Sequence, residues 1–158
     1  MKALRRFEKA PGAARIEDIP IPEPGPCQIL LKVHYCGVCG SDLHAYLNHA
    51  GYETVLESVT FGHEVSGVID SVGSEVLDWQ PGDRAILTAI QFTDHDCHYV
   101  QTGLPQLSPS RRVQGLHLDG GMAEYVTIDQ EFLIRIPEGL GLRDASLTEP
   151  LSVADHCV

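Results

Sequence analysis

The sequence has neither an excess of positive charge nor a long hydrophobic run. Its 158 residues carry 22 acidic but only 11 basic side chains, which gives a formal net charge of −11. A surface of that sign repels the phosphates of nucleic acids and the headgroups of anionic lipids. No apolar stretch approaches the roughly 18 residues of a membrane span, and the N-terminus lacks the apolar segment of a secretory signal. We therefore expect a cytoplasmic protein whose partners include neither nucleic acid nor membranes.

Cysteines are few and irregularly spaced, which argues against a disulfide framework. An odd set without the spacing of a small disulfide-linked scaffold indicates thiols or metal ligands in a reducing compartment. Hydrophobic residues make up 43% and charged residues 21% of the chain, a composition typical of a folded domain rather than a disordered segment. The five cysteines are Cys27, Cys36, Cys39, Cys97 and Cys157.

Short apolar segments, often rich in β-branched residues, lie between recurrent turn signals such as Pro81-Gly82 and Gly120-Gly121. Many short strands separated by turns are typical of antiparallel barrels. The sequence therefore predicts a mainly β fold with short helices, arranged as a partly closed antiparallel β-barrel. The segments predicted as strands are Ile29–Val33, Val65–Val72, Arg84–Leu87, Ala123–Ile128 and Phe132–Ile136.

Helical signals are few and short. Ser41-Asp42 is suited to cap a helix that runs through His44 and Leu47. A second turn of helix is expected over Arg143–Leu147. A last helix is expected to begin near Pro150, because proline is favoured in the first helical turn.

Two segments combine residue types that bind metal ions. His63 and Glu64 follow a glycine at the start of a predicted strand, and the segment from Cys39 to His44 adds a thiol, a hydroxyl, a carboxylate and an imidazole. A lone histidine is more often an ordinary polar residue than a ligand. Zinc held by a thiolate, an imidazole and one further ligand keeps a position open for an alcohol. Together the two segments therefore predict a catalytic zinc site.

At the level of motifs, the chain resembles the zinc-containing medium-chain alcohol dehydrogenase family, and most closely its polyol, sugar and threonine dehydrogenases. The resemblance implies a GroES-like catalytic domain over residues 1–148. Residues 149–158 would begin the helix that leads to a Rossmann domain, which this chain does not contain. The motifs, in the family's order, are Cys39-Gly40-Ser41-Asp42-Leu43-His44, Gly62-His63-Glu64, Pro81-Gly82-Asp83-Arg84, Gly120-Gly121-Met122-Ala123-Glu124-Tyr125-Val126 and Glu149-Pro150-Leu151-Ser152-Val153.

The resemblance also implies a role for each acid and ligand at the zinc. Cys39 and His63 look like the first two zinc ligands, and Glu149 occupies the position of an acidic third ligand, bound directly or through water. Glu64 resembles a neighbouring glutamate that can exchange onto the metal. Asp42 looks like the acceptor that orients His63 and raises its basicity.

Proton transfer and hydride transfer would use further groups. Ser41 would take the proton of the alcohol and His44 would help to pass it to solvent. The hydride acceptor, NAD or NADP, would come from the absent Rossmann domain. The Gly139-Leu140-Gly141 segment is interpreted as a turn, so no residue of this chain is assigned to cofactor binding. The expected substrate is an alcohol, polyol or sugar, the full-length protein is expected to be a homo-oligomer, and the fragment alone is expected to be inactive.

The segment at about 90–115 corresponds to a lobe that in many relatives holds a second, structural zinc through four cysteines. Here the four positions are Asp94, Cys97, Val100 and Ser108, so a structural zinc is expected to be absent. The run from Asp94 to His98 contains only ligand types, but adjacent residues rarely converge on one ion. We expect a solvated loop there rather than a new metal site.

Several alternatives remain open at this point. Cys36 and Cys39 have the spacing of a redox pair or half a zinc knuckle, although Cys36 fits better as a packing residue. The chain could also be a stand-alone GroES-like module that binds metal or a partner without catalysis. A zinc-free reductase fits poorly, because such members generally lack the cysteine and histidine ligands. Tyr46, Ile90 and Phe92 fall near places that line the substrate cleft in the family, but barrel packing or lobe surface is the preferred interpretation of each. Packing or exposed roles are also expected for Cys27, Cys157, His34, His49, His117 and His156.

Overall fold

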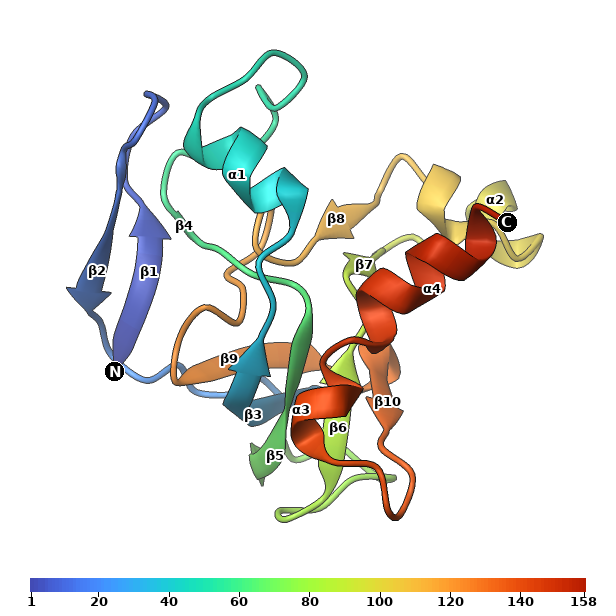
Figure 1. Cartoon of the computed structure of the whole chain (residues 1–158). Coiled ribbons are helices and arrows are strands. Elements are labelled where there is room, and N and C mark those ends of the chain that lie inside the picture. Colours follow the sequence, from blue (N-terminus) through green and yellow to red (C-terminus); the bar gives the residue numbers. More distant parts are fainter.

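The computed structural model describes residues 1–158 and is built mainly of β-strands (Figure 1). Its largest sheet has five antiparallel strands in the order β10-β6-β5-β3-β9. The outer strands β10 and β9 do not pair with each other, so the sheet remains open and the predicted partly closed barrel is confirmed. The bounds are β3 (Gln28–Cys36), β5 (Val65–Val72), β6 (Arg84–Leu87), β9 (Tyr125–Asp129) and β10 (Leu133–Arg135).

The main core lies on the inner face of this sheet. Alternate residues of the strands are buried there, as expected for a sheet with one face covered. Ile29, Leu31, Val65, Ile69 and Val126 are each at most 2% exposed. Two register shifts in the pairing of β3 with β5 bend this pair, which helps the sheet to curve around the core.

A second sheet, in the order β2-β1-β4, is formed by β1 (Lys2–Arg6), β2 (Ala14–Asp18) and β4 (Val59–Thr60). The sequence did not predict these strands, because charged residues interrupt β1 and β2 and because β4 has only two residues. Arg6 is nevertheless 1% exposed, and its guanidinium donates to the side chain of Asn48 at 2.6 Å. A smaller core that includes Val55, Val59 and Phe61 lies next to this sheet.

The helices are short: α1 (Gly40–Tyr46), α2 (His98–Gln101), α3 (Leu142–Ala145) and α4 (Thr148–His156). Of the expected Ser41-Asp42 cap of α1, the part assigned to Asp42 is confirmed, because its side chain completes a capping box, whereas Ser41 lies inside the helix. Cys39 is the N-cap, and the Asp42 carboxylate accepts its backbone N–H at 3.0 Å. No helix combines the length and apolar character needed to cross a membrane.

The segment expected as the lobe is a loop closed by a two-stranded ladder. β7 (Ile90–Gln91) pairs with β8 (Arg112–Val113), and between them lie α2 and the 3-10 turn η1 (Pro105–Leu107). A second 3-10 turn, η2 (Gln130–Phe132), joins β9 to β10. Figure 1 shows α2 at the end of the molecule where α4 also ends.

Candidate metal centre

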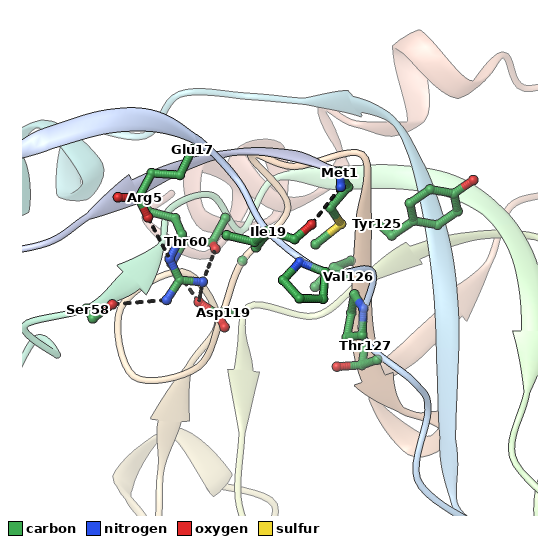
Figure 2. Close-up of a pocket in the computed structure, with 13 residues that line it drawn as sticks. Met1, Arg5, Glu17, Ile19, Ser58, Thr60, Asp119, Tyr125, Val126 and Thr127 are labelled. Atoms are coloured by element: carbon green, nitrogen blue, oxygen red, sulfur yellow. Dashed lines mark hydrogen bonds and ion pairs between the residues drawn. The ribbon is translucent and has the colours of Figure 1, made fainter.

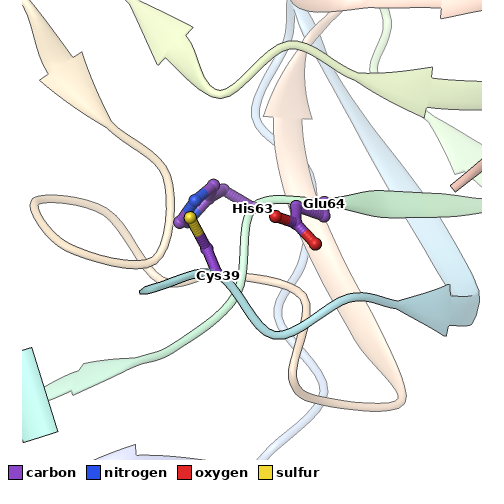
Figure 3. Close-up of side chains that lie close together, drawn as sticks. All are labelled: Cys39, His63 and Glu64. Carbon is purple, nitrogen blue, oxygen red and sulfur yellow. The ribbon is translucent and has the colours of Figure 1, made fainter. Parts of the chain in front are cut away.

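Three side chains with metal-binding atoms converge at one place. The Sγ atom of Cys39, a ring nitrogen of His63 and a carboxylate oxygen of Glu64 lie within 4.8 Å of one another. Figure 3 shows that they come from two neighbouring segments, the residue that precedes α1 and the two residues that precede β5. His63 is 4% and Glu64 is 8% exposed, so two of the three are buried. No second group of three such side chains converges elsewhere in the chain.

Two glycines make room for this cluster. Gly62 has a φ of 98°, and a Cβ there would lie 2.6 Å from the Sγ atom of Cys36 and 2.7 Å from Cγ of Met122. Only glycine adopts this backbone readily. A Cβ on Gly37 would lie 1.9 Å from a carboxylate oxygen of Glu64. The glycines therefore allow the two segments to approach closely enough for Cys39 and His63 to meet.

Asp42 ties the two segments together. Its buried carboxylate accepts the backbone N–H groups of Cys39 at 3.0 Å and Gly62 at 3.3 Å. Its Oδ1 atom lies 3.8 Å from the Nδ1 atom of His63, which is buried and has no hydrogen-bond partner. Burial raises the pKa of Asp42, while the charge of His63 and the two backbone hydrogen bonds act in the opposite direction.

Groups that can move protons extend from the cluster along α1. The hydroxyl of Ser41 lies 3.3 Å from Nε2 of His63. One turn later, Nδ1 of His44 lies 2.8 Å from Nδ1 of His49, and the ring of His44 stacks on Tyr52. His49 was expected to pack or to be exposed, and it is exposed, but its contact with His44 was not predicted. Its position depends on the left-handed backbone of Asn48, with a φ of 54°, which turns the chain back over α1.

Glu149 lies on α4 and is not one of the three clustered side chains. Burial raises its pKa, the charge of His63 lowers it, and the charges of Glu64 and Asp42 raise it further. The charges that act on the pKa of Glu149 are thus those of residues at the cluster. Together with Ile90, Ile86 and Ile134, it lines a cavity of about 280 Å³ beside α4.

Cys36 is placed as a packing residue. It lies against the main core, and burial raises the pKa of its thiol to about 12. A redox-active cysteine needs a readily formed thiolate. This environment therefore does not support a redox pair of Cys36 and Cys39.

The ligand-type side chains of the lobe do not converge. Asp94 accepts the backbone N–H of Asp96, while His95 lies 3.5 Å from Glu131. Asp94, His95, Asp96 and His98 are all exposed. Of the other residues expected near the substrate, Phe92 packs against the main core, and Tyr46 lines an apolar pocket together with Asp42 and Leu43.

Comparison with known proteins gives a consistent result. The family model of the alcohol dehydrogenase GroES-like domain matches residues 25–138. The chain is 37% identical to a sorbitol dehydrogenase of Halalkalibacterium halodurans, over all of this chain and 45% of the relative. It is 33% identical to an L-threonine 3-dehydrogenase of Stenotrophomonas maltophilia, over 99% of this chain and 46% of the relative.

Solved structures share the fold as well. A protein described as a zinc-binding dehydrogenase from Sinorhizobium meliloti 1021, in complex with NADP, superimposes with a TM-score of 0.88 at 35% identity, over 98% of this chain and 44% of that protein. The 2R,3R-butanediol dehydrogenase of Bacillus subtilis gives a TM-score of 0.83 at 35% identity, over 97% of this chain and 45% of that one. The chain thus spans less than half the length of these relatives.

Proposed function

Because this chain belongs to the family of alcohol dehydrogenase GroES-like domains, we propose that it is the catalytic domain of a zinc-dependent dehydrogenase. The complete protein oxidises an alcohol or polyol, or reduces the corresponding carbonyl compound, by hydride transfer to or from NAD(P). Residues 1–148 form the catalytic domain, and α4 leads toward a nucleotide-binding domain beyond this chain. We place the enzyme in the cytoplasm as a homo-oligomer.

The observation that carries this proposal is the convergence of Cys39, His63 and Glu64. Sulfur, imidazole nitrogen and carboxylate oxygen are the donors that zinc prefers, and a catalytic site leaves a fourth position open. The donor set therefore fits zinc. Glu149 is proposed as a further acidic group at the metal, bound directly or through water. Glu64 is proposed as the neighbouring acid that can exchange onto the metal.

The side chains around the cluster perform the proton chemistry. Bound zinc supplies a Lewis acid that lowers the pKa of an alcohol hydroxyl. Asp42 orients the imidazole of His63, whose buried Nδ1 has no other partner. Ser41 accepts the proton of the alcohol at its Oγ atom and releases its own hydroxyl proton to His44, which passes a proton onward.

His49 extends this path. An imidazole relays a proton by accepting it at one nitrogen and releasing the proton bound to the other. His44 therefore accepts at Nε2 and releases its Nδ1 proton to Nδ1 of His49, 2.8 Å away. Tyr52, stacked on His44, holds the ring in place for this transfer.

The substrate is proposed to be a polar secondary alcohol. The cavity that contains Glu149 has both apolar walls, such as Ile86 and Ile90, and the hydroxyls of Thr88 and Ser152. The named relatives, a sorbitol dehydrogenase and an L-threonine 3-dehydrogenase, support substrates with several polar groups.

A chelation experiment on the full-length protein tests the proposal. The protein is purified with zinc and assayed for reduction of NAD⁺ or NADP⁺ with a set of polyols, sugars and amino alcohols. We expect activity that is lost after zinc is removed and restored when zinc is added back. Activity that survives complete removal of metal, or a zinc-loaded protein that turns over none of these alcohols with either nucleotide, would contradict it. The 158 residues alone are expected to form no NADH.

A further inference from the structure

A cavity of about 690 Å³ lies where the loop after α1 meets the end of the lobe. Its walls come from residues 54–56, from residues 106–112 and from His117. Backbone hydrogen bonds join these segments: Leu56 donates to the carbonyl of Leu116, next to His117, at 3.0 Å, and His117 donates to that of Val113, next to Arg112, at 2.8 Å. The cavity is therefore built from parts of the chain that are fixed relative to one another.

The charge of this cavity is opposite to that of the chain. Arg111 and Arg112 both line it, and no carboxylate does. Neither arginine takes part in an ion pair. Each uses one Nη1 atom on a backbone carbonyl, of Gln106 for Arg111 and of Arg111 for Arg112. Since a guanidinium has five N–H donors, most of their hydrogen-bonding capacity faces solvent or the cavity.

Arg5, in contrast, is an arginine of this acidic protein whose charge is paired with carboxylates. It lines a different cavity, of about 510 Å³ (Figure 2). There its guanidinium lies 3.2 Å from Asp119 and 3.8 Å from Glu17. Hydrogen bonds to the hydroxyls of Ser58 and Thr60 complete its surroundings. The charge of Arg5 is thus neutralised by the protein itself, whereas the charges of Arg111 and Arg112 are not.

An acidic residue beside the wall segment 54–56 does not compensate this pair either. Glu53 precedes Thr54, but its carboxylate accepts the backbone N–H of Gly51 at 2.9 Å. The two arginines, together with burial, lower the pKa of His117. The cavity therefore remains positively charged while the chain as a whole is strongly negative.

Hydroxyl groups complete the arrangement. Nδ1 of His117 accepts the backbone N–H of Val113 at 3.1 Å, which places the ring proton of the neutral imidazole on Nε2. Nε2 lies 3.2 Å from the hydroxyl oxygen of Thr54, so the ring donates to Thr54. The hydroxyl proton of Thr54 is then free to donate to a ligand. Leu56, Leu107 and Pro109 provide an apolar part of the wall.

We propose that this cavity binds a small organic phosphate, whose phosphate group contacts Arg111, Arg112 and Thr54 and whose organic part lies against Leu56 and Leu107. Paired guanidinium groups match the geometry of phosphate oxygens. The volume exceeds that of inorganic phosphate and lies within the range of about 300–1,000 Å³ that is typical of small-molecule sites. The site is separate from the cluster of Cys39, His63 and Glu64 and does not depend on zinc.

Calorimetric titration of the full-length protein with inorganic phosphate, glucose 6-phosphate and glucose tests the proposal. We expect glucose 6-phosphate to bind more tightly than inorganic phosphate, and glucose not to bind at this cavity. In Arg111→Gln/Arg112→Gln the affinity for glucose 6-phosphate should fall roughly a hundredfold, since the loss of each charge-assisted contact costs at least about tenfold. Arg112→Lys keeps the charge but not the planar guanidinium. Its affinity for glucose 6-phosphate should lie between those of the unmodified protein and the double variant.

Arg143→Gln is the matched control, because Arg143 is exposed, forms no ion pair and lies outside this cavity. It should bind like the unmodified protein. Phosphate held at any other position, such as a nucleotide site in another domain, would be insensitive to the double substitution. Equal binding by the double variant, equal weakening by Arg143→Gln, or binding of glucose as tight as that of its phosphate would overturn the proposal. The unfolding temperature without ligand verifies that the double variant is folded.

Discussion

The cluster around Cys39 and the lobe between β7 and β8 contain similar residue types but arrange them differently. At the cluster, Asp42, His63 and Glu64 are 4–8% exposed, and the residues that meet come from segments more than twenty positions apart. In the lobe, the run from Asp94 to His98 is denser in ligand types, yet most of these side chains are exposed and they do not converge on one point. Burial and convergence of distant segments, rather than local density of ligand types, therefore distinguish a candidate metal centre.

The largest expected effect compares a thiol in each region. Cys39→Ser should reduce the zinc content from about one ion per chain to almost none, because a catalytic zinc depends on only three protein ligands. Cys97→Ser should leave it unchanged, since Cys97 has no converging partners. Metal analysis of both purified variants measures this. If the two substitutions lowered the zinc content equally, the lobe would have to contribute to metal binding.

The next effect concerns the space around Glu64. Gly37→Ala would place a Cβ 1.9 Å from the present position of a Glu64 oxygen and force the carboxylate to move. We expect zinc affinity to fall roughly ten- to a hundredfold, the range seen when the positioning of a ligand is disturbed. Gly40→Ala is the control, because no atom lies within 4 Å of its added Cβ. Competition with a chromogenic chelator gives both affinities, and an unchanged affinity in Gly37→Ala would exclude Glu64 as a ligand.

A third comparison concerns a hydroxyl in each region. Ser66 is fully buried in β5 and donates to the carbonyl of Leu142 at 2.6 Å, which fixes α3 and the start of α4 to the sheet. Ser66→Ala should cost about 1 kcal/mol of unfolding free energy, because a hydrogen bond made by a fully buried side chain is lost, although Ser146 still donates to the same carbonyl. In the lobe, Ser110 accepts the N–H groups of Thr93 and Asp94 at a more exposed site, so Ser110→Ala should cost less. Urea denaturation of both variants measures the two losses of unfolding free energy. A larger loss in Ser110→Ala than in Ser66→Ala would contradict this ranking.

The smallest effect is a pH dependence at the base of the lobe. Burial, with the charges of Arg112 and Arg111, lowers the pKa of His117 below its usual 6.5 in the folded state. The unfolded chain therefore binds more protons as the pH falls through about 6.5, and stability decreases there. His117→Gln should show a shallower loss of melting temperature between pH 7 and pH 5, with His156→Gln as the control for removing a histidine. A steeper loss in His117→Gln would contradict the assigned direction.

Much of the main sheet was predictable from local pattern. β5 and β6 have the predicted bounds, because each is an apolar run that ends at a turn. β9 starts two residues later than predicted, since Ala123 forms only an isolated bridge with Ala3. β1 and β2 were missed, because their charged residues conceal the pattern. The buried guanidinium of Arg6 in β1 donates to the nearby carbonyl of Glu8 and to Asn48, a partner that is distant in sequence.

The candidate site was predictable in its ligand types but not in its arrangement. Cys39 and His63 were expected together from the motifs, while Glu64 rather than Glu149 completes the group of three in the structure. That difference depends on the position of α4, which no local pattern specifies. The contacts of His49 and His117 were missed for the same reason, since each depends on a turn or on segments that meet only in the folded chain.

Cys39 precedes α1 and His63 precedes β5, so zinc bound by both residues would also stabilise the fold against unfolding and proteolysis. A cation bound by both residues would close the intervening chain into a ring that exists only in the native state. By mass action, each tenfold increase of free zinc above the dissociation constant would add about 1.4 kcal/mol to the free energy of unfolding. Resistance to proteases would then rise and fall with the zinc supply of the cell, even when no alcohol is being oxidised.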